Sequence, residues 1–139
     1  MRTDKYILTR TKDRGFRFVD QTPTKDIMEQ VMFLDDEAIK GSFYVETAWF
    51  WKATPPGPKN HAHDYDEVLA FFGTNPEDSH DLGGEVELWI DGEKHLLTRS
   101  FMAFIPKGVK HCPLRVTKVD RPIFHFATSP MRKYTGDRK

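Results

Sequence analysis

The chain has 139 residues, 38% of them hydrophobic, which is enough for one sizeable core but too few for two domains that would each bury their own. Lys plus Arg and Asp plus Glu each number 21, so the formal net charge is zero, which argues against a nucleic-acid or membrane partner. No apolar run is long enough for a transmembrane helix, and the single cysteine, Cys112, excludes an internal disulfide. We therefore expect a single domain, residues 1–139, in the cytoplasm.

Short segments rich in β-branched and aromatic residues, separated by Pro and Gly, predict an all-β protein. In the first half of the chain, residues 6–8, 16–19 and 42–52 are the expected strands. Residues 25–40 are ambiguous, because they fit either a short helix over 35–40 or a strand near 30–34. Three prolines between Thr54 and Pro58 predict a loop, since proline offers no backbone donor to a sheet.

The second half begins with an expected strand over 62–72 and an exposed polar loop over 73–84. Residues 85–90 and 93–98 flank Asp91-Gly92, a dipeptide that favours the two-residue turn of a β-hairpin. Strands over 101–105, 111–119 and 122–127 follow, and the basic tail, residues 131–139, is expected to fray. About eight strands with hairpin turns and at most one short helix predict a closed barrel or a jelly roll.

The clearest candidate site lies in residues 61–67. On a strand, residues of equal parity share one face, so His61, His63 and Glu67 are expected to point the same way. The two imidazoles would lie about 6.6 Å apart along the strand, close enough to reach one metal ion. Asp64 and Asp66 have the opposite parity and are poorer ligand candidates.

A second segment adds a third imidazole. Pro106 and Gly108 predict a tight turn, and His111 opens the strand that follows it. Three imidazoles and one carboxylate suit Fe, Mn, Ni, Cu, Co or Zn. Such a ligand set leaves one or two coordination positions open, as a catalytic metal site requires.

Together, the two segments resemble the two motifs of the cupin family. The residues that match the first motif are His61, His63, Glu67 and Gly73. The residues that match the second motif are Pro106, Gly108 and His111. The resemblance implies a double-stranded β-helix, or cupin barrel, of six to eight strands with one divalent transition metal ion inside. It places the N-terminal strands in residues 1–50 and the barrel motifs in residues 57–128.

The chain departs from the cupin pattern at several positions outside the four expected ligands. Gly57 is closer to His61 than the corresponding family glycine, and five residues rather than six separate Glu67 from Gly73. Ser100 stands where the family usually has Gly, and Arg115 stands where it often has Asn. These differences affect where the strands end rather than the ligand positions.

Side chains near these motifs are candidates for contacts with a substrate. Because residues 111, 113 and 115 share one face of an ideal strand, Arg115 can enter the cavity and bind a carboxylate or phosphate. An exposed or salt-bridged strand arginine is the simpler interpretation. Trp49 and Trp51 are candidates for the cavity wall, with core packing as the alternative.

Two further residues, together with Glu67, are candidates for proton transfer. His125 alternates with Phe124 and Phe126, and it fits either a catalytic acid or base or a hydrogen-bonded barrel histidine. Tyr65 shares parity with the ligands and fits either a proton donor or a packed tyrosine. Cys112 has the wrong parity for the metal and is interpreted as a small buried hydrophobic residue.

The leading hypothesis is a mononuclear metal-dependent enzyme that acts on a small oxygenated organic molecule. The cupin resemblance implies dioxygenases, isomerases, and lyases or decarboxylases, and the aromatic residues around the motifs favour a dioxygenase-like activity. A non-catalytic module that binds or senses a metal or a small molecule is the alternative, and a metal-free scaffold is a third possibility. The resemblance also implies a homodimer formed through residues 1–50.

Overall fold

The computed structural model describes residues 3–11, 24–55, 57 and 60–131. In this part of the chain a 3-10 helix, η1 (Asp4–Tyr6), precedes eight strands. The strands are β1 (Met28–Leu34), β2 (Tyr44–Phe50), β3 (Glu67–Phe72), β4 (Asp81–Ile90), β5 (Glu93–Arg99), β6 (Phe101–Ile105), β7 (His111–Val119) and β8 (Ile123–Ser129). No helix among these residues is long and apolar enough to cross a membrane.

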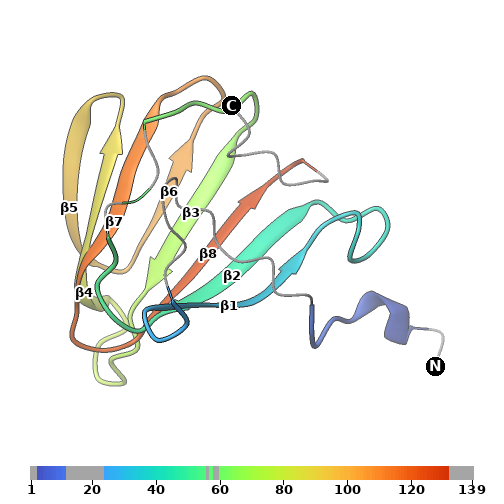
Figure 1. Cartoon of the computed structure of the whole chain (residues 1–139), viewed down its shortest axis with the longest axis horizontal. Coiled ribbons are helices and arrows are strands. Elements are labelled where there is room, and N and C mark those ends of the chain that lie inside the picture. Colours follow the sequence, from blue (N-terminus) through green and yellow to red (C-terminus); the bar gives the residue numbers. More distant parts are fainter. Residues whose placement is uncertain (1–2, 12–23, 56, 58–59, 132–139) are drawn as a thin grey trace.

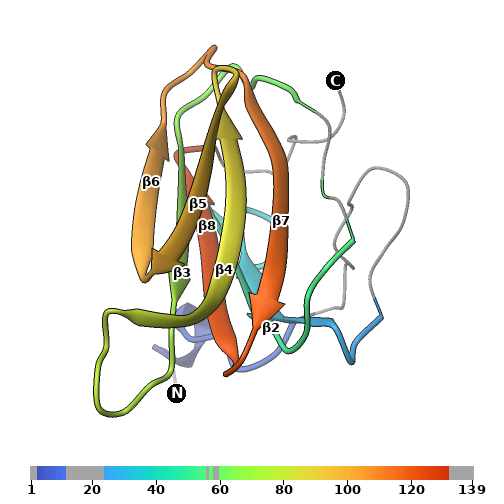
Figure 2. The same cartoon turned by 90° about the vertical axis from the view of Figure 1, so that its left-hand side faces the viewer.

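The strands form two antiparallel sheets, which are the two layers of the molecule (Figure 1). The larger sheet has the order β1-β2-β8-β3-β6, and the smaller sheet has the order β5-β4-β7. Figure 2 shows the smaller sheet in front of the larger one. Strands distant in the sequence are neighbours, such as β2 with β8 and β4 with β7, which is the connectivity of a jelly roll. The predicted all-β jelly roll is confirmed.

Alternating burial along the strands defines the interior between the two sheets. In β2 every second residue is buried and the residues between are half-buried, and β8 repeats this pattern. The largest fully buried apolar side chains come from both sheets: Phe50, Phe71, Leu82, Leu88, Ile105 and Ile123. The alternation of buried residues therefore shows which face of β2 and β8 is turned to the interior.

The predicted hairpin between β4 and β5 is confirmed. Asp91 and Gly92 have φ angles of 49° and 79°, the positive values of the two-residue turn that Asp-Gly favours. The backbone twist of this turn matches that of the flanking strands, so the sequence determines the register of the pair locally.

The N-terminal predictions were partly wrong. Residues 6–8 form no strand: η1 ends at Tyr6, and the Tyr6 and Ile7 side chains are exposed. The ambiguous segment, residues 25–40, contains strand β1. Turns replace the possible helix over 35–40, because the Asp35 carboxylate accepts the backbone N–H groups of Glu37 and Ala38. The expected strand over 16–19 and most of the tail lie outside the described residues.

Two predicted boundaries near the motifs also change. The strand expected from residue 62 begins only at Glu67, and the loop expected over 73–84 is shorter because β4 begins at Asp81. Side chains of Asn75 and Asp78 accept backbone N–H groups two residues further along the loop, from Glu77 and His80. These local hydrogen bonds let a short polar loop turn back into the sheet.

Gly73 and Ser100, two positions of the motifs, lie together at the end of β3. The Gly73 N–H donates a hydrogen bond of 3.0 Å to Ser100 Oγ, and Ser100 Oγ donates one of 2.9 Å to the Ser79 carbonyl. A Cβ atom at position 73 would overlap the backbone carbonyl of Asp81. Glycine is therefore required here by close packing of two chain segments, and the serine ties these segments together.

Candidate metal centre

The segment that carries the two histidines of the first motif is not a continuous strand. His61 forms an isolated antiparallel bridge with His111, with N–H to carbonyl distances of 2.9 and 2.8 Å in the two directions. Residues 62–66 then leave the sheet before β3 starts at Glu67. Ideal strand parity therefore does not position His61 and His63, because their positions depend on what this segment bonds to.

The turn of the second motif holds this segment in place. Gly108, with φ 83°, directs its N–H to the carbonyl of His63 at 2.9 Å, and the Lys107 N–H donates to the Asp66 carboxylate at 2.9 Å. Glycine adopts this positive φ without steric cost. Asp66 thus supports the turn of the second motif. The two motifs are bonded to each other directly.

These contacts bring three of the four predicted ligands into one cluster, with His61 beside it. His61 Nε2 lies 3.2 Å from His63 Nε2, His63 Nε2 lies 3.6 Å from Glu67 Oε1, and His111 Nε2 lies 3.3 Å from the same oxygen. His63, Glu67 and His111 are all buried, and their donor atoms lie within 4.8 Å of one another. Ligands at ~2.1 Å from an ion are separated by about 3.0 to 3.4 Å when they are adjacent in an octahedral or tetrahedral site. The spacing of His63, Glu67 and His111 therefore fits a single transition metal ion, and His61 lies beside this cluster.

Hydrogen bonding and stacking orient two of the imidazoles. His111 Nδ1 lies 3.2 Å from the Val109 carbonyl, which selects the tautomer that leaves the Nε2 lone pair directed at Glu67 and His63. The His63 ring stacks on the Tyr65 ring with centroids 4.7 Å apart and an interplanar angle of 6°. Tyr65 is thus a buried packing partner of a candidate ligand.

No sequence-family model matches this chain, and no curated protein matches it in sequence. Solved structures match it in shape. Recombinant oxalate oxidase in complex with glycolate matches with a TM-score of 0.50 and 14% identity, covering 79% of this chain and 54% of its own. KdgF from Halomonas sp. matches with a TM-score of 0.48 and 16% identity over 86% and 96% of the two chains. An RmlC-like cupin from Shewanella frigidimarina matches with a TM-score of 0.46 and 22% identity, over 91% of this chain and 97% of the cupin chain.

At these identities the similarity concerns the fold alone, and the chain spans about half the length of the oxalate oxidase chain. Oxalate oxidase is a cupin, and the match to it agrees with the two antiparallel sheets described above. The chain has the cupin fold. The resemblance inferred from the two motifs is confirmed at this level.

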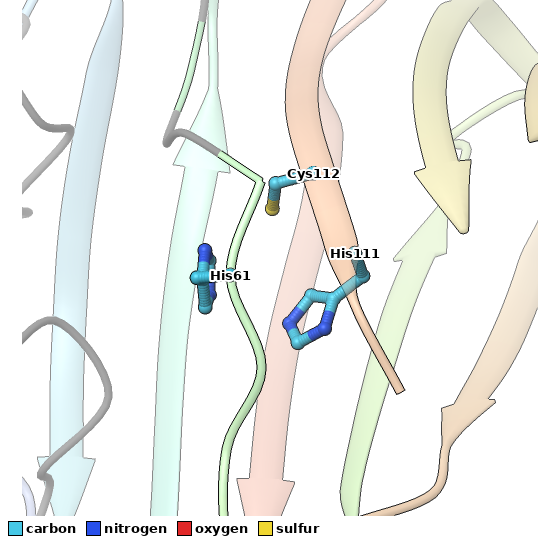
Figure 3. A group of neighbouring side chains, drawn as sticks. All are labelled: His61, His111 and Cys112. Atoms are coloured by element: carbon cyan, nitrogen blue, oxygen red, sulfur yellow. The ribbon is translucent and has the colours of Figure 1, made fainter. Parts of the chain in front are cut away.

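Cys112 lies closer to the candidate metal ligands than strand parity predicted. His111 on β7 pairs with Ile90 on β4, and Leu114 pairs with Leu88. Between these two pairs β7 therefore advances by three residues while β4 advances by two. This β-bulge, together with a φ of 80° at Cys112, breaks the alternation, so that His111 and Cys112 are both buried. The donor atoms of His61, His111 and Cys112 lie within 4.8 Å of one another (Figure 3). The argument that parity turns Cys112 away was wrong.

Cys112 would have to lose its thiol proton to bind a metal ion. Burial, with a smaller contribution from the Glu67 carboxylate, raises the pKa of the thiol to about 12. A neutral thiol is a poor metal ligand, since the thiolate is the coordinating form. His63, Glu67 and His111 form the alternative cluster, which contains no thiol.

The same bulge moves Arg115 away from the interior. Beyond the bulge the interior positions of β7 are Leu114 and Val116, so Arg115 points to the opposite face of the small sheet. Its Nε is buried there without a hydrogen-bond partner. The expectation that residues 111 and 115 share a face, and hence that Arg115 enters the cavity, is wrong for this reason.

Trp49 and Trp51 also lie outside the interior. They alternate with the buried residues Ala48 and Phe50, and their rings stack at 5.3 Å on the outer face of the large sheet, where Trp49 also contacts Phe124. Neither the cavity-wall interpretation nor core packing describes these residues. They form an aromatic group on the outside of the sheet.

His125 faces the interior but lies well away from the metal ligands. It pairs with Phe71, four residues along β3 from Glu67, which corresponds to about 13 Å along the strand. Its ring packs against Phe50 and Phe71, and its Nδ1 lies 2.9 Å from the Ala70 carbonyl. Desolvation lowers the pKa of His125 to about 4, so the ring is neutral at neutral pH. These contacts favour the interpretation as a hydrogen-bonded barrel histidine.

Two buried polar residues of β2 were missed from the sequence. Tyr44 and Glu46 point into the interior, and the Tyr44 hydroxyl donates a hydrogen bond to the Glu46 carboxylate. The signal was present in the alternation of β2, whose interior positions include Ala48 and Phe50. A carboxylate in phase with core residues is unusual enough to mark a functional candidate.

Proposed function

We propose that this protein holds one divalent transition metal ion with His61, His63, Glu67 and His111 and uses it in a reaction of a small oxygenated organic molecule. The observation that carries the proposal is the spacing of the donor atoms, between 3.2 and 3.6 Å, in a largely buried cluster. Three neutral imidazoles and one carboxylate are ligands that Fe, Mn, Ni, Cu, Co and Zn accept. The identity of the ion is left open by this donor set.

When bound, such an ion supplies Lewis acidity and an open position for an oxygen atom of a substrate. The protein supplies the geometry: the Val109 carbonyl fixes the tautomer of His111, and Tyr65 fixes the plane of His63. Burial of Glu67 keeps water from competing for its carboxylate. A dioxygenase-like reaction is the first activity to test, with isomerase and lyase or decarboxylase reactions as the other outcomes of a screen.

The test of the metal centre is the metal content of the purified protein. We expect about one ion per chain in the native protein and loss of that ion in His61→Ala and in His111→Ala. His80→Ala is the matched control, because this histidine lies on the exposed loop before β4, and it should keep the metal. Unchanged metal content in both site variants would refute the ligand set. A substrate screen with the identified metal, under air and without oxygen, then separates oxygen-dependent from oxygen-independent chemistry.

A further inference from the structure

The outer face of the larger sheet, which is turned away from the smaller sheet, is almost wholly apolar (Figure 2). The strand register arranges its outward residues in rows that cross the sheet from β1 to β6. The first row is Leu34, Val45, Thr128, Val68 and Phe104. The second row is Met32, Thr47, Phe126, Ala70 and Met102. The third row is Glu29, Trp49, Phe124 and Phe72, and its glutamate is the one charged residue in the three rows.

The two edges of this face have complementary shapes. At the β6 edge, the side chains of Met102 and Phe104 project from the sheet, and each is 61% exposed. At the opposite edge, an apolar groove of about 230 Å³ lies between β1, β2 and the N-terminal segment. Its lining includes outward residues of the first two rows and two residues of the N-terminal segment: Met32, Leu34, Val45, Thr47, Tyr6 and Leu8. The projecting side chains and the groove thus occupy the same two rows at opposite edges of one face.

We propose that a second copy of this chain covers the face, and that β6 of each copy docks in the groove of the other. Two sheets pack face to face at a separation of about 10 Å with their strands nearly aligned. A twofold axis that runs between them along β8 exchanges the two edges of the sheet and keeps each row in place. It sets Phe104 opposite the partner's Leu34 and Met102 opposite the partner's Met32. Because the interface is isologous, each of these contacts occurs twice.

The size and charge of the face suit a second copy as its partner. Five strands about 4.8 Å apart, with a central strand β3 of 6 residues, give a flat area about 24 Å wide and 20 Å long. Two such faces bury close to the roughly 1,000 Å² that a specific interface needs, and the groove and projecting side chains add to it. The formal net charge is zero, so two copies do not repel each other. The homodimer expected through residues 1–50 would use β1 and β2, whereas this interface also needs β6.

The first experiment measures the dimer dissociation constant by sedimentation velocity over a dilution series of the full chain. We expect the native protein to sediment with twice the 16.2 kDa mass of one chain. Phe104→Lys and Met102→Lys each bury an unpaired charge in the partner's groove, so each should raise the dissociation constant by about a hundredfold or more. Leu96→Lys is the matched control, because Leu96 is 54% exposed but lies on the outer face of the smaller sheet. It should leave the dissociation constant unchanged, and all three variants should keep the native metal content.

The second experiment tests the direction of the twofold axis with a bismaleimide that spans about 10 Å, the separation of packed sheets. A mixture of Phe104→Cys and Leu34→Cys proteins should give cross-linked dimers. Phe104→Cys alone should give at least fivefold fewer, because its two new thiols lie at opposite edges, about 19 Å apart across four strand spacings. Cys112 is buried and is present in every sample.

Three results would overturn the inference. The first is a native protein that stays monomeric at concentrations on the order of 100 μM, which would leave a lipid surface or another protein to cover the face. The second is a native dissociation constant in both Phe104→Lys and Met102→Lys. The third is cross-linking of Phe104→Cys alone as efficient as that of the mixture. None of these results bears on the metal centre, which is tested separately by metal content.

Discussion

The buried histidine His125 makes a quantitative prediction about acid stability. In the folded protein its pKa is lowered from 6.5 to about 4, mainly by desolvation, whereas the unfolded chain takes up this proton near pH 6.5. Below pH 6.5 the unfolded state therefore binds more protons than the folded state, and the stability that His125 contributes is lost as the pH falls from 6.5 toward 4. Between pH 7.5 and 4.5 this loss amounts to roughly 2.5 kcal/mol at 1.36 kcal/mol for each pKa unit.

The assay is urea unfolding in the presence of a chelator at pH 7.5 and pH 4.5. The native protein is compared with His125→Gln, whose amide can still donate to the Ala70 carbonyl but does not titrate. Other titrating groups are common to both proteins, so the difference between their pH-dependent losses isolates His125. We expect the variant to lose about 2.5 kcal/mol less than the native protein on acidification. Equal losses in the two proteins would show that His125 is solvated or able to bind a proton in the folded state.

Three further predictions concern the motifs and the cysteine beside them. Asp66→Ala removes the acceptor of the Lys107 N–H, and it should cost about 1 kcal/mol in urea unfolding and speed the loss of metal to a chelator. Cys112→Ala should keep the metal in elemental analysis, and the native thiol, with its pKa raised to about 12, should react with a disulfide reagent at pH 8 only after urea is added. Gly73→Ala places a methyl group against the Asp81 carbonyl, and it should lower the urea midpoint sharply or abolish soluble expression.

The parts of the fold that were predicted correctly are those determined by short stretches of sequence. Asp91-Gly92 specifies its own turn, and the strands on either side follow from it. The strand bounds 101–105 and 111–119 were predicted without error, because Pro106 and Gly108 separate the two strands and Pro122 follows the second. Residues 6–8 were wrong because an apolar triplet has no preference for a strand until a neighbouring strand pairs with it.

The motif spacing selected residues that lie near one another, but the geometry used to explain it was wrong. His63, Glu67 and His111 form one cluster with His61 beside it, and strand parity does not bring them together. The segment before β3 is held by hydrogen bonds from the turn at Gly108, which no local pattern in residues 61–67 reveals. The spacing of the motif was therefore a better guide than the idealised geometry used to explain it.

The errors at Cys112 and Arg115 have one physical cause. A period of two assigns every residue of a strand to a face, and one inserted residue reverses the assignment for all residues beyond it. The bulge between His111 and Leu114 does this to β7, so that Cys112 turns inward and Arg115 turns outward. The sequence of β7 gives a partial signal, since its apolar residues 112, 114 and 116 are in phase with each other and out of phase with His111.

That phase change has a consequence for the candidate metal centre. Without the bulge, a β7 that buried Leu114 and Val116 would direct His111 to the outer face, and the donor set would lose its most deeply buried imidazole. In β7, Leu114 and Val116 line the apolar core, and His111 lies at a position of opposite parity. For His111 to face the same interior, one irregular residue is needed between His111 and Leu114. Cys112, with its positive φ, occupies that place, and its proximity to His61 and His111 follows from the bulge itself. We therefore interpret the position of Cys112 beside His61 and His111 as a result of this backbone geometry. For this reason Cys112→Ala is expected to keep the metal.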